Sequence, residues 1–401
     1  MAFDFMLRAL RGIDGRWLTA LIVALYFGFL AAGKFVFHLQ LWHHMGVPTL
    51  PEPFHDLRDI AIGIERFHAS DHPWSPESLA YSTAAYNYTK WWLCAGYLGL
   101  NLKTVYAFGV GIGTLFFACS LFVLGRLNLI EGCVAGLVLV SPNVMTAIER
   151  ANADLVIFSL MALAIGLRRF IPLSTASITL AAFLKMYPVA ALAALAHPPW
   201  RKTLPRLLAG IALVTVDVLT SLDELHHIAF TVTRVGWFSY GSTTMMEGYW
   251  QTRPPGSSDP YHKVFAIGSL LLLAVAALSI WARPRVKVKP EWERELYVFR
   301  IGAALFVGTF ALGSNLDYRT MFLIFCLPLL FVLRKESGSA ALWATTALFS
   351  IVVYLNWRFF LTDSILGFFL LKQLTAWVLV VLLTGIYAST FPWLQRDRKT
   401  A

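Results

Sequence analysis

The sequence predicts an all-α polytopic membrane protein, and its composition is the first reason. Of its 401 residues, 58% are hydrophobic and only 14% are charged, whereas an ordinary soluble domain carries about 25% charged residues. A single soluble core stops growing near about 250–300 residues, so a chain this apolar must place much of its surface against lipid. The mean hydropathy of +0.63 agrees. Together these observations exclude a soluble fold.

The apolar segments supply the second reason. About 20 residues of α-helix cross the roughly 30 Å hydrocarbon layer of a bilayer. We expect about ten full spans, two of them short, at residues 17–37, 104–125, 130–146, 154–167, 207–219, 264–281, 296–312, 320–333, 340–357 and 366–387. The first follows a basic segment, as a signal peptide does, but its apolar run is too long and more spans follow. We interpret it as a retained helix.

Segment 171–196 is apolar enough to cross a membrane, but it contains Lys185 and Pro188 and is flanked by basic residues on both sides. Proline interrupts a helix, and irregular backbone at membrane depth is tolerated where it lines a cavity. We expect this segment to re-enter the membrane, or to cross it twice as two short helices broken at Pro188. The alternative is a single crossing, which would place the later basic loops outside.

The net charge of +10 is explained by orientation. With the amino terminus inside and segment 171–196 returning to the inner face, lysine and arginine gather in the inner segments, as the positive-inside rule requires. The basic excess therefore needs no nucleic-acid partner. We expect a multi-pass protein of the inner (cytoplasmic) membrane whose functional site faces the periplasm or exterior.

The predicted topology makes residues 1–401 a single integral membrane domain. Its cytoplasmic ends are residues 1–16 and 388–401, and its two long outer loops are residues 38–103 and 220–263. Connections between packed helices usually need only about 2–8 residues. The two outer loops are much longer, so we expect the chemistry to lie on the outer face.

The first outer loop contains Asp56 and Asp59, three residues apart. A carboxylate near a membrane surface has its pKa raised by partial desolvation, which suits a general base that acts on a sugar or lipid hydroxyl. The alternative is a solvated loop in which Asp56 pairs with Arg58 or Lys90. Aromatic side chains of this loop can stack on sugar rings or lie in the interfacial belt; they are Trp74, Tyr86, Tyr88 and Trp91.

Polar residues also gather in two short outer turns. Such groups at the edge of a bilayer are costly unless they pair or bind something. In the first turn, Arg150 and Asp154 would be four residues apart on a helix and can simply pair. In the second turn, Arg319 can bind phosphate through two parallel hydrogen bonds, with Asp317 to orient it or to pair with it. The two turns are Glu149, Arg150, Asn152, Asp154 and Ser314, Asn315, Asp317, Tyr318, Arg319.

Lys185 lies in the middle of segment 171–196, next to Tyr187. An ionisable residue at that depth is a functional hypothesis by default. The alternative is a lysine whose ammonium group snorkels to the interface. The four cysteines are scattered without Cys-x-x-Cys spacing, so neither a metal site nor a disulfide framework is indicated.

Five motifs follow one another along the chain: Phe54-x-Asp56-Leu57-Arg58, Tyr86-Asn87-Tyr88, Glu149-Arg150-x-Asn152-x-Asp154, Leu184-Lys185-Met186-Tyr187-Pro188 and Ser314-Asn315-Leu316-Asp317-Tyr318-Arg319. Their order and spacing resemble the C-type (GT-C) membrane glycosyltransferases, and the family-87 relatives that use polyprenyl-phosphate sugars are the most similar group. Two positions depart from the pattern: Thr89 stands where the family usually has proline, and Ala151 where glycine is common.

The resemblance implies a helical bundle of GT-C type and an inverting transferase with its site outside. A lipid-phosphate sugar donor would enter laterally, and the first-loop base falls on Asp56, with Asp59 in reserve. Arg319, Lys185 and Arg150 would bind the donor phosphate, and a lipid or glycan hydroxyl would accept the sugar. The other substrate-binding candidates are Asn87, Tyr88, Glu149, Asn152, Asp154, Tyr187, Asn315, Asp317 and Tyr318.

No cofactor is required by this mechanism, because arginine and lysine can neutralise a monophosphate leaving group. Asp56 and Asp59 can share a divalent cation, which is a minor alternative. Two other functions fit the sequence. A transporter or flippase for a lipid-linked sugar would place polar residues through the whole membrane depth. A non-catalytic protein of envelope assembly would need only the apolar helices.

Overall fold

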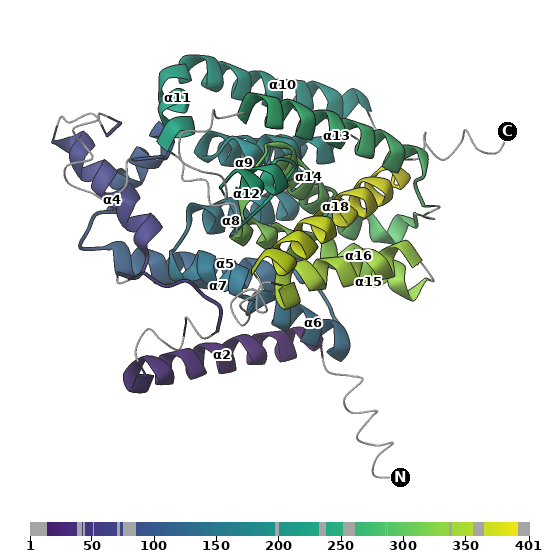
Figure 1. Cartoon of the computed structure of the whole chain (residues 1–401), viewed down its shortest axis with the longest axis horizontal. Helices are drawn as coiled ribbons and strands as arrows, with labels where there is room; N and C mark the ends of the chain where they lie inside the picture. The colour runs from purple at the N-terminus through teal and green to yellow at the C-terminus, as the bar shows by residue number, and fades with distance from the viewer. Residues whose placement is uncertain are drawn as a thin grey trace, which may run out of the picture. The chain divides into compact units, whose positions relative to one another are not determined.

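The computed structural model describes residues 14–37, 42, 45–50, 52–69, 73–74, 86–196, 200–231, 238–251, 261–284, 286, 288–336, 339–355 and 365–391. Nearly all of their regular structure is helical, so the all-α class is confirmed (Figure 1). The chain forms two compact units. Unit 1 comprises Met1–Pro48, Leu121–Met145 and Val235–Ala401, and unit 2 comprises Thr49–Ser120 and Thr146–Arg234. The predicted cytoplasmic ends lie largely outside the described residues.

Unit 2 contains the first outer loop and segment 171–196. Within it α9 packs against α8 on one side and α10 on the other, and α4 packs against η2. The unit boundaries fall inside α5 and α7. Its elements are α4 (His55–His68), η2 (Lys90–Leu98), α5 (Val105–Leu124), α7 (Pro142–Glu149), α8 (Ala153–Gly166), α9 (Ile171–Leu184), η3 (Tyr187–Leu195), α10 (Trp200–Thr220) and α11 (Leu222–Thr231).

Helix α4 forms because its apolar residues recur at helical spacing. Leu57, Ile60, Ala61 and Ile64 lie on one face, are buried, and pack against η2 and Tyr86. The opposite face carries the charged residues, which is the pattern of an amphipathic surface helix. The first outer loop is therefore folded over its described part, with α4 and η2 supplying its core.

Segment 171–196 consists of two helices, α9 and η3, in agreement with the expected break. The break lies at Lys185 and Met186 rather than at Pro188, because proline is compatible with the first turn of a helix and here begins η3. Whether the segment re-enters the membrane or crosses it stays a prediction.

The first outer loop stabilises the end of α9. The last carbonyl groups of a helix have no partner within the helix. Thr89 Oγ1 donates to the carbonyl oxygens of Phe183 and Leu184 at 3.0 and 3.2 Å, and Trp92 Nε1 donates to that of Leu184 at 3.0 Å. These side chains satisfy carbonyl groups that the break would otherwise leave unpaired.

Unit 1 contains the remaining helices and a two-stranded antiparallel ribbon. Tyr240 pairs with Asn315 and Ser239 with Leu316. Its elements are α2 (Gly15–Phe37), α6 (Leu129–Leu139), β1 (Ser239–Tyr240), α12 (Thr244–Gln251), α13 (Tyr261–Trp281), η5 (Pro290–Trp292), α14 (Glu293–Ala311), β2 (Asn315–Leu316), η6 (Asp317–Cys326), α15 (Leu327–Lys335), α16 (Ser339–Phe349), the π-helical η7 (Ser350–Tyr354) and α18 (Ile365–Ser389).

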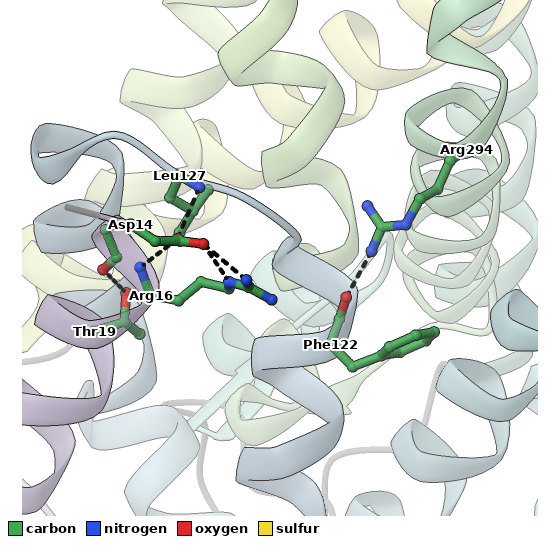
Figure 2. A network of polar contacts seen from close by, with 7 residues as sticks. Asp14, Arg16, Thr19, Phe122, Leu127 and Arg294 are labelled. Atoms are coloured by element: carbon green, nitrogen blue, oxygen red, sulfur yellow. Dashed lines mark hydrogen bonds and ion pairs between the residues drawn. The ribbon is translucent and has the colours of Figure 1, made fainter. Parts of the chain in front are cut away.

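Helices α2 and α6 of unit 1 approach closely through small residues. The Gly15 N–H donates to the Leu127 carbonyl at 2.7 Å, and Thr19 Oγ1 donates to the Gly132 carbonyl at 2.9 Å. Figure 2 shows the start of this contact, where Asp14 accepts hydrogen bonds from Arg16 at 2.7–3.0 Å. The Arg16 guanidinium lowers the pKa of Asp14 to about 2. This ion pair fixes the first turn of α2.

Arg294 stabilises the carboxyl end of α5, whose last residues belong to unit 1. Its Nη2 donates to the Phe122 carbonyl oxygen at 2.6 Å (Figure 2) and to the Val123 carbonyl oxygen at 2.9 Å. Gly125 follows with φ 67°, the left-handed conformation common after a helix end. A cation at the carboxyl end of α5 also complements the helix dipole.

Fewer helices than expected are long and apolar enough to cross a membrane. Among the described residues there are four, or five if the bent pair α6 and α7 forms one span, so the prediction of about ten full spans is not confirmed. Helices α8 and α9 have only 14 residues each, and segment 320–333 is divided between η6 and α15. The four are Val105–Leu124, Trp200–Thr220, Lys263–Trp281 and Gly367–Ser389.

The contact between Thr89 and the α9 carbonyl groups can be tested by substitution. We expect Thr89→Val to lower the free energy of unfolding by about 1–3 kcal/mol, because it leaves buried carbonyl groups with one partner fewer. Denaturation in mixed detergent micelles, followed by circular dichroism, measures it. Thr114→Val is the control, since the Thr114 hydroxyl is exposed and bonds only within α5. Equal destabilisation by both variants would refute this role.

Candidate functional site

Asp56 lies in the first turn of α4, where two side chains from another part of unit 2 meet it. Asn152 Nδ2 donates a short hydrogen bond to Asp56 Oδ2. Arg150 Nη1 lies 3.9 Å from Asp56 Oδ1, which is beyond hydrogen-bond distance. The Asp56 side chain is 13% exposed. One carboxylate oxygen is therefore anchored, and the other faces a cation without a tight bond to it.

Asn152 is oriented by its place at the start of α8. As the N-cap residue it accepts a hydrogen bond from the Asp154 N–H through Oδ1 at 2.9 Å, which satisfies one of the unpaired donors of a helix start. The amide nitrogen of Asn152 then points away from α8 and reaches Asp56. The cap thus fixes the position of the donor that holds the carboxylate.

Ala151 reverses the chain between α7 and α8 with a left-handed backbone, φ 44°. Its Cβ makes this conformation cost about 1–2 kcal/mol compared with a right-handed one. The Asn152 N–H donates to the Ala147 carbonyl at 2.9 Å, which closes the turn. The glycine that the resemblance expects at this position would adopt the same backbone without that cost.

Phe54, directly before α4, is the other described non-glycine residue with positive φ, at 61°. Its N–H donates to the Glu149 carbonyl at 2.8 Å. Its ring packs over Gly109 of α5, where a Cβ would lie 2.6 Å from a ring atom. Backbone strain of this kind clusters at functional sites, and here both strained residues flank the contact between Asp56, Arg150 and Asn152.

Two buried polar atoms beside Asp56 lack a hydrogen-bond partner among the described residues. They are Glu149 Oε2 and Arg150 Nε. The other Glu149 oxygen accepts only a long bond, 3.3 Å, from the Leu50 N–H. Buried polar groups are nearly always paired in native proteins, so these two atoms are available to a ligand.

Asp59 follows Asp56 by nearly one turn of α4, and His55 Nε2 lies 3.8 Å from its carboxylate. Burial raises the pKa of Asp59 to about 6; the nearby Asp56 charge also raises it, and His55, Arg58 and Arg150 oppose the shift. Asp59 therefore holds a proton at higher pH than an ordinary aspartate does. Both candidate bases lie on one helix, but Asn152 holds Asp56.

Three structural alternatives from the sequence are wrong. Arg58 pairs with Glu52 at 2.7 Å, and Lys90 Nζ bonds Ser221 Oγ at 2.7 Å, so neither is the partner that Asp56 was expected to have in a solvated loop. Arg150 and Asp154 do not share a helix, because α7 ends at Glu149 and α8 begins at Ala153.

The third concerns Lys185, which does not snorkel. Its Nζ lies 2.5 Å from Asp154 Oδ1, and the Asp154 side chain is fully buried. This ion pair joins the first turn of α8 to the break between α9 and η3, a segment that the Thr89 and Trp92 hydrogen bonds already hold. The charge of Lys185 is thus compensated within unit 2.

The aromatic residues of the first outer loop pack with one another rather than facing solvent. Tyr86 and Tyr88 are buried beside Trp74 and Trp92, and the Trp91 ring stacks on Phe183 at 5.0 Å. Trp74 and Trp91 remain half-buried, and stacking of these side chains on sugar rings or a place in the interfacial belt stays a prediction. The residues form the core that supports α4 and η2.

A second polar cluster lies in unit 1, around the end of the ribbon. Asp317 Oδ2 accepts a hydrogen bond from Lys372 Nζ of α18 at 2.6 Å, and both side chains are buried. Arg319 donates a short hydrogen bond to Asn315 Oδ1, and Asn315 Nδ2 donates to the Thr309 carbonyl at 2.5 Å. The expected orienting role of Asp317 thus belongs to Asn315.

Lys372 and Gln373 were missed by the sequence reasoning. Gln373 Nε2 donates to the Ser239 carbonyl of β1 at 2.7 Å, and Lys372 bonds Asp317, the residue that follows β2, so α18 contacts both sides of the ribbon. The sequence carries a signal for this, since a lysine within the apolar segment 366–387 marks an expensive buried charge. The mean hydropathy of the segment does not register a single lysine.

The remaining predicted substrate-binding residues are distributed over both units. Asn87 is half-buried, while Tyr88 and Tyr187 of unit 2 and Tyr318 of unit 1 are buried. Substrate contact by these residues stays a prediction. Among the described residues no group of three or more His, Cys, Asp or Glu side chains is arranged to hold a metal ion.

Comparison of the chain with family models, curated proteins and solved structures returned no match. The evidence on function is therefore the geometry of the two polar clusters and the order of the motifs in the sequence.

The strain at Ala151 predicts a stabilising substitution. We expect Ala151→Gly to raise the free energy of unfolding by up to about 1 kcal/mol, because glycine adopts positive φ without the Cβ clash. The greater conformational entropy that glycine loses on folding offsets part of this gain. Ala162→Gly, inside α8, is the control and should lower it by about 1 kcal/mol. Unfolding in mixed micelles measures both. Destabilisation by Ala151→Gly would contradict the left-handed turn.

The contact between Phe54 and Gly109 predicts that a substitution in α5 alters the position of Asp56 in α4. We expect Gly109→Ala to displace the Phe54 ring and with it the first turn of α4, and to lower any activity of the site at least about tenfold. Gly111→Ala is the matched control, since no atom lies within 4 Å of the added Cβ. The transfer activities of the two variants, compared with that of the wild type, measure it. Equal activity of Gly109→Ala and Gly111→Ala would refute this prediction.

Proposed function

We propose that this protein is a membrane glycosyltransferase that moves a sugar from a polyprenyl-phosphate donor to a lipid or glycan hydroxyl on the outer face of the inner membrane. The supporting observation is the Asp56 carboxylate, anchored through one oxygen by Asn152 and presented between two strained residues. A structural ion pair would not need this arrangement. The resemblance of the five motifs to GT-C enzymes names the substrate class.

The reaction is a single displacement. Asp56 Oδ1 takes the proton of the acceptor hydroxyl, whose oxygen forms a bond to the anomeric carbon. The bond from that carbon to the phosphate oxygen breaks, and polyprenyl phosphate leaves with the electron pair. One base and one displacement invert the anomeric configuration. Because the Asn152 bond occupies Oδ2, the acceptor proton goes to the oxygen that faces Arg150.

The cations of the chain can stabilise the leaving phosphate. Fixed positive charges aimed at charge that develops in the transition state are usually the largest catalytic contribution. We assign this role to Arg150, which lies beside the base in unit 2. The role that the resemblance implies for Arg319 of unit 1 stays a prediction. Lys185 is a weaker candidate than the sequence implied, because Asp154 already neutralises it at 2.5 Å. The mechanism does not require a metal ion, because arginine and lysine side chains can neutralise the leaving phosphate.

The test is transfer of radiolabel from a panel of polyprenyl-phosphate sugars to membrane lipid and glycan, in vesicles that contain the protein. We expect Asp56→Asn to lower transfer about 10²–10⁴-fold, because the amide cannot accept the proton but still accepts the Asn152 bond. Asp59→Asn is the matched control, since it removes a carboxylate from the same helix, and it should retain transfer.

The outcomes separate the functions. Loss of transfer with Asp56→Asn alone supports the proposal. Transfer that survives both substitutions would exclude Asp56 as the base. No transfer from any donor, with a folded wild-type protein, would favour transport or a non-catalytic role in envelope assembly.

A transporter or flippase for a lipid-linked sugar is the second candidate, and one observation favours it. Lys372 and Asp317 form a buried ion pair, and Lys372 lies on α18, a candidate membrane span. Buried charge pairs within membrane helices commonly mark transport pathways. Translocation of a fluorescent lipid-linked sugar across proteoliposomes, abolished by Lys372→Met and unaffected by Asp56→Asn, would establish this function instead.

A further inference from the structure

An exposed aromatic and aliphatic patch lies at the end of α4 and η2 in unit 2. Phe67, Tyr97 and Leu98 are 48%, 81% and 78% exposed. The His68 ring connects them, with ring centroids 6.0 Å from Phe67 and 6.3 Å from Tyr97. Isolated exposed apolar residues are ordinary, but a contiguous patch marks a binding surface. We refer to Phe67, His68, Tyr97 and Leu98 as the aromatic patch.

The aromatic patch adjoins the start of a candidate membrane span. Helix η2 ends at Leu98, a short turn follows, and α5 begins at Val105. The first turns of α5 also expose apolar side chains, since Tyr106 and Val110 are 52% and 61% exposed. The aromatic patch is therefore followed directly in sequence by α5, of which only a third is buried in the protein.

Helix α4 is held at the level where α5 begins. At one end the Phe54 ring contacts Gly109, and at the other Glu65 Oε1 accepts a hydrogen bond from the Leu102 N–H at 3.0 Å. The Val105 N–H donates to the Asn101 carbonyl at 3.1 Å, so the residues just before α5 already have a helical hydrogen bond. Leu102 and Gly109, which contact the two ends of α4, are therefore about 10 Å apart along the axis of α5.

We propose that the aromatic patch inserts into the headgroup region of the bilayer, so that α4 lies in the membrane interface beside the entry of α5. Aromatic side chains with a polar edge, such as Tyr97, favour this region. The partner is a lipid surface. The proposal does not depend on the transferase function.

One charged residue close to the patch in sequence fits the same depth. Lys103 is exposed, and a cation at this level can contact lipid phosphate while its stem covers apolar surface. Asp56 lies in the first turn, at the other end of α4. A soluble partner protein would have no reason to follow the start of a membrane span.

Depth-dependent quenching tests the placement. We would attach an environment-sensitive fluorophore to Leu98→Cys or Phe67→Cys in a chain that lacks the accessible Cys94, Cys119 and Cys133, keeping Cys326, which is buried. Nanodiscs contain lipids with a quencher near the headgroup or near the chain end, and iodide quenches from water. Glu52→Cys is the water-exposed control and Leu115→Cys, in the middle of α5, is the membrane-core control.

We expect the labels at residues 67 and 98 to show a blue-shifted emission, stronger quenching by the shallow lipid probe than by the deep one, and loss of most iodide quenching. Iodide quenching equal to that of Glu52→Cys would overturn the proposal. Quenching by the deep probe, as at Leu115→Cys, would also overturn it. Protection from all three quenchers would identify the patch as a protein contact between copies of the chain.

Discussion

The hydrogen bond from Asn152 to Asp56 is the interaction on which the candidate site depends. It joins the turn between α7 and α8 to the first turn of α4, two parts of unit 2 that are far apart in sequence. Three local features place its partners: the N-cap geometry of Asn152, the left-handed Ala151, and the bond from the Phe54 N–H to the Glu149 carbonyl. Each has an energetic cost or a strict orientation, so the arrangement is held by the surrounding fold.

Two buried charge pairs among the described residues connect elements of the fold. Asp154 with Lys185 joins α8 to the break after α9, and Asp317 with Lys372 joins the ribbon to α18. A buried pair contributes little net stability, because desolvation offsets the attraction, but loss of one partner is severe. These pairs therefore fix which elements meet. In both units the pair lies next to a residue with an expected functional role, Arg150 in one and Arg319 in the other.

Backbone breaks are stabilised in the same manner. The end of α9 would leave carbonyl groups unpaired in apolar surroundings, and Thr89 and Trp92 supply the missing donors. Arg294 does so for the end of α5. Thr89 stands where the GT-C pattern usually has proline, and its hydroxyl donates to the last carbonyl groups of α9. A proline at this position would have no hydroxyl to donate. The first outer loop is thus part of the support for segment 171–196.

Hydropathy alone does not fix the number of spans, because an apolar segment can be buried either in lipid or in protein. In α14 and η6 the apolar side chains face protein: Phe299, Phe306, Phe322 and Phe325 are fully buried within unit 1. In α10 and α13 they face outward, and most of each span is exposed. A window average cannot separate these cases, because a core helix and a membrane helix can have the same composition.

The sequence by itself determined the membrane character, the helical class, the division of segment 171–196 and the short polar turns where the candidate residues lie. These follow from composition, apolar spacing and the local effects of proline, all of which act over one or two helical turns. Only the tertiary structure decided the partners: Asp56 with Asn152 rather than Arg58, Asp154 with Lys185 rather than Arg150, and Asp317 with Lys372. The physical reason is that a buried charged group pairs with whatever hydrogen-bond donor or opposite charge the packing brings within a few ångströms, and that proximity depends on contacts between distant segments.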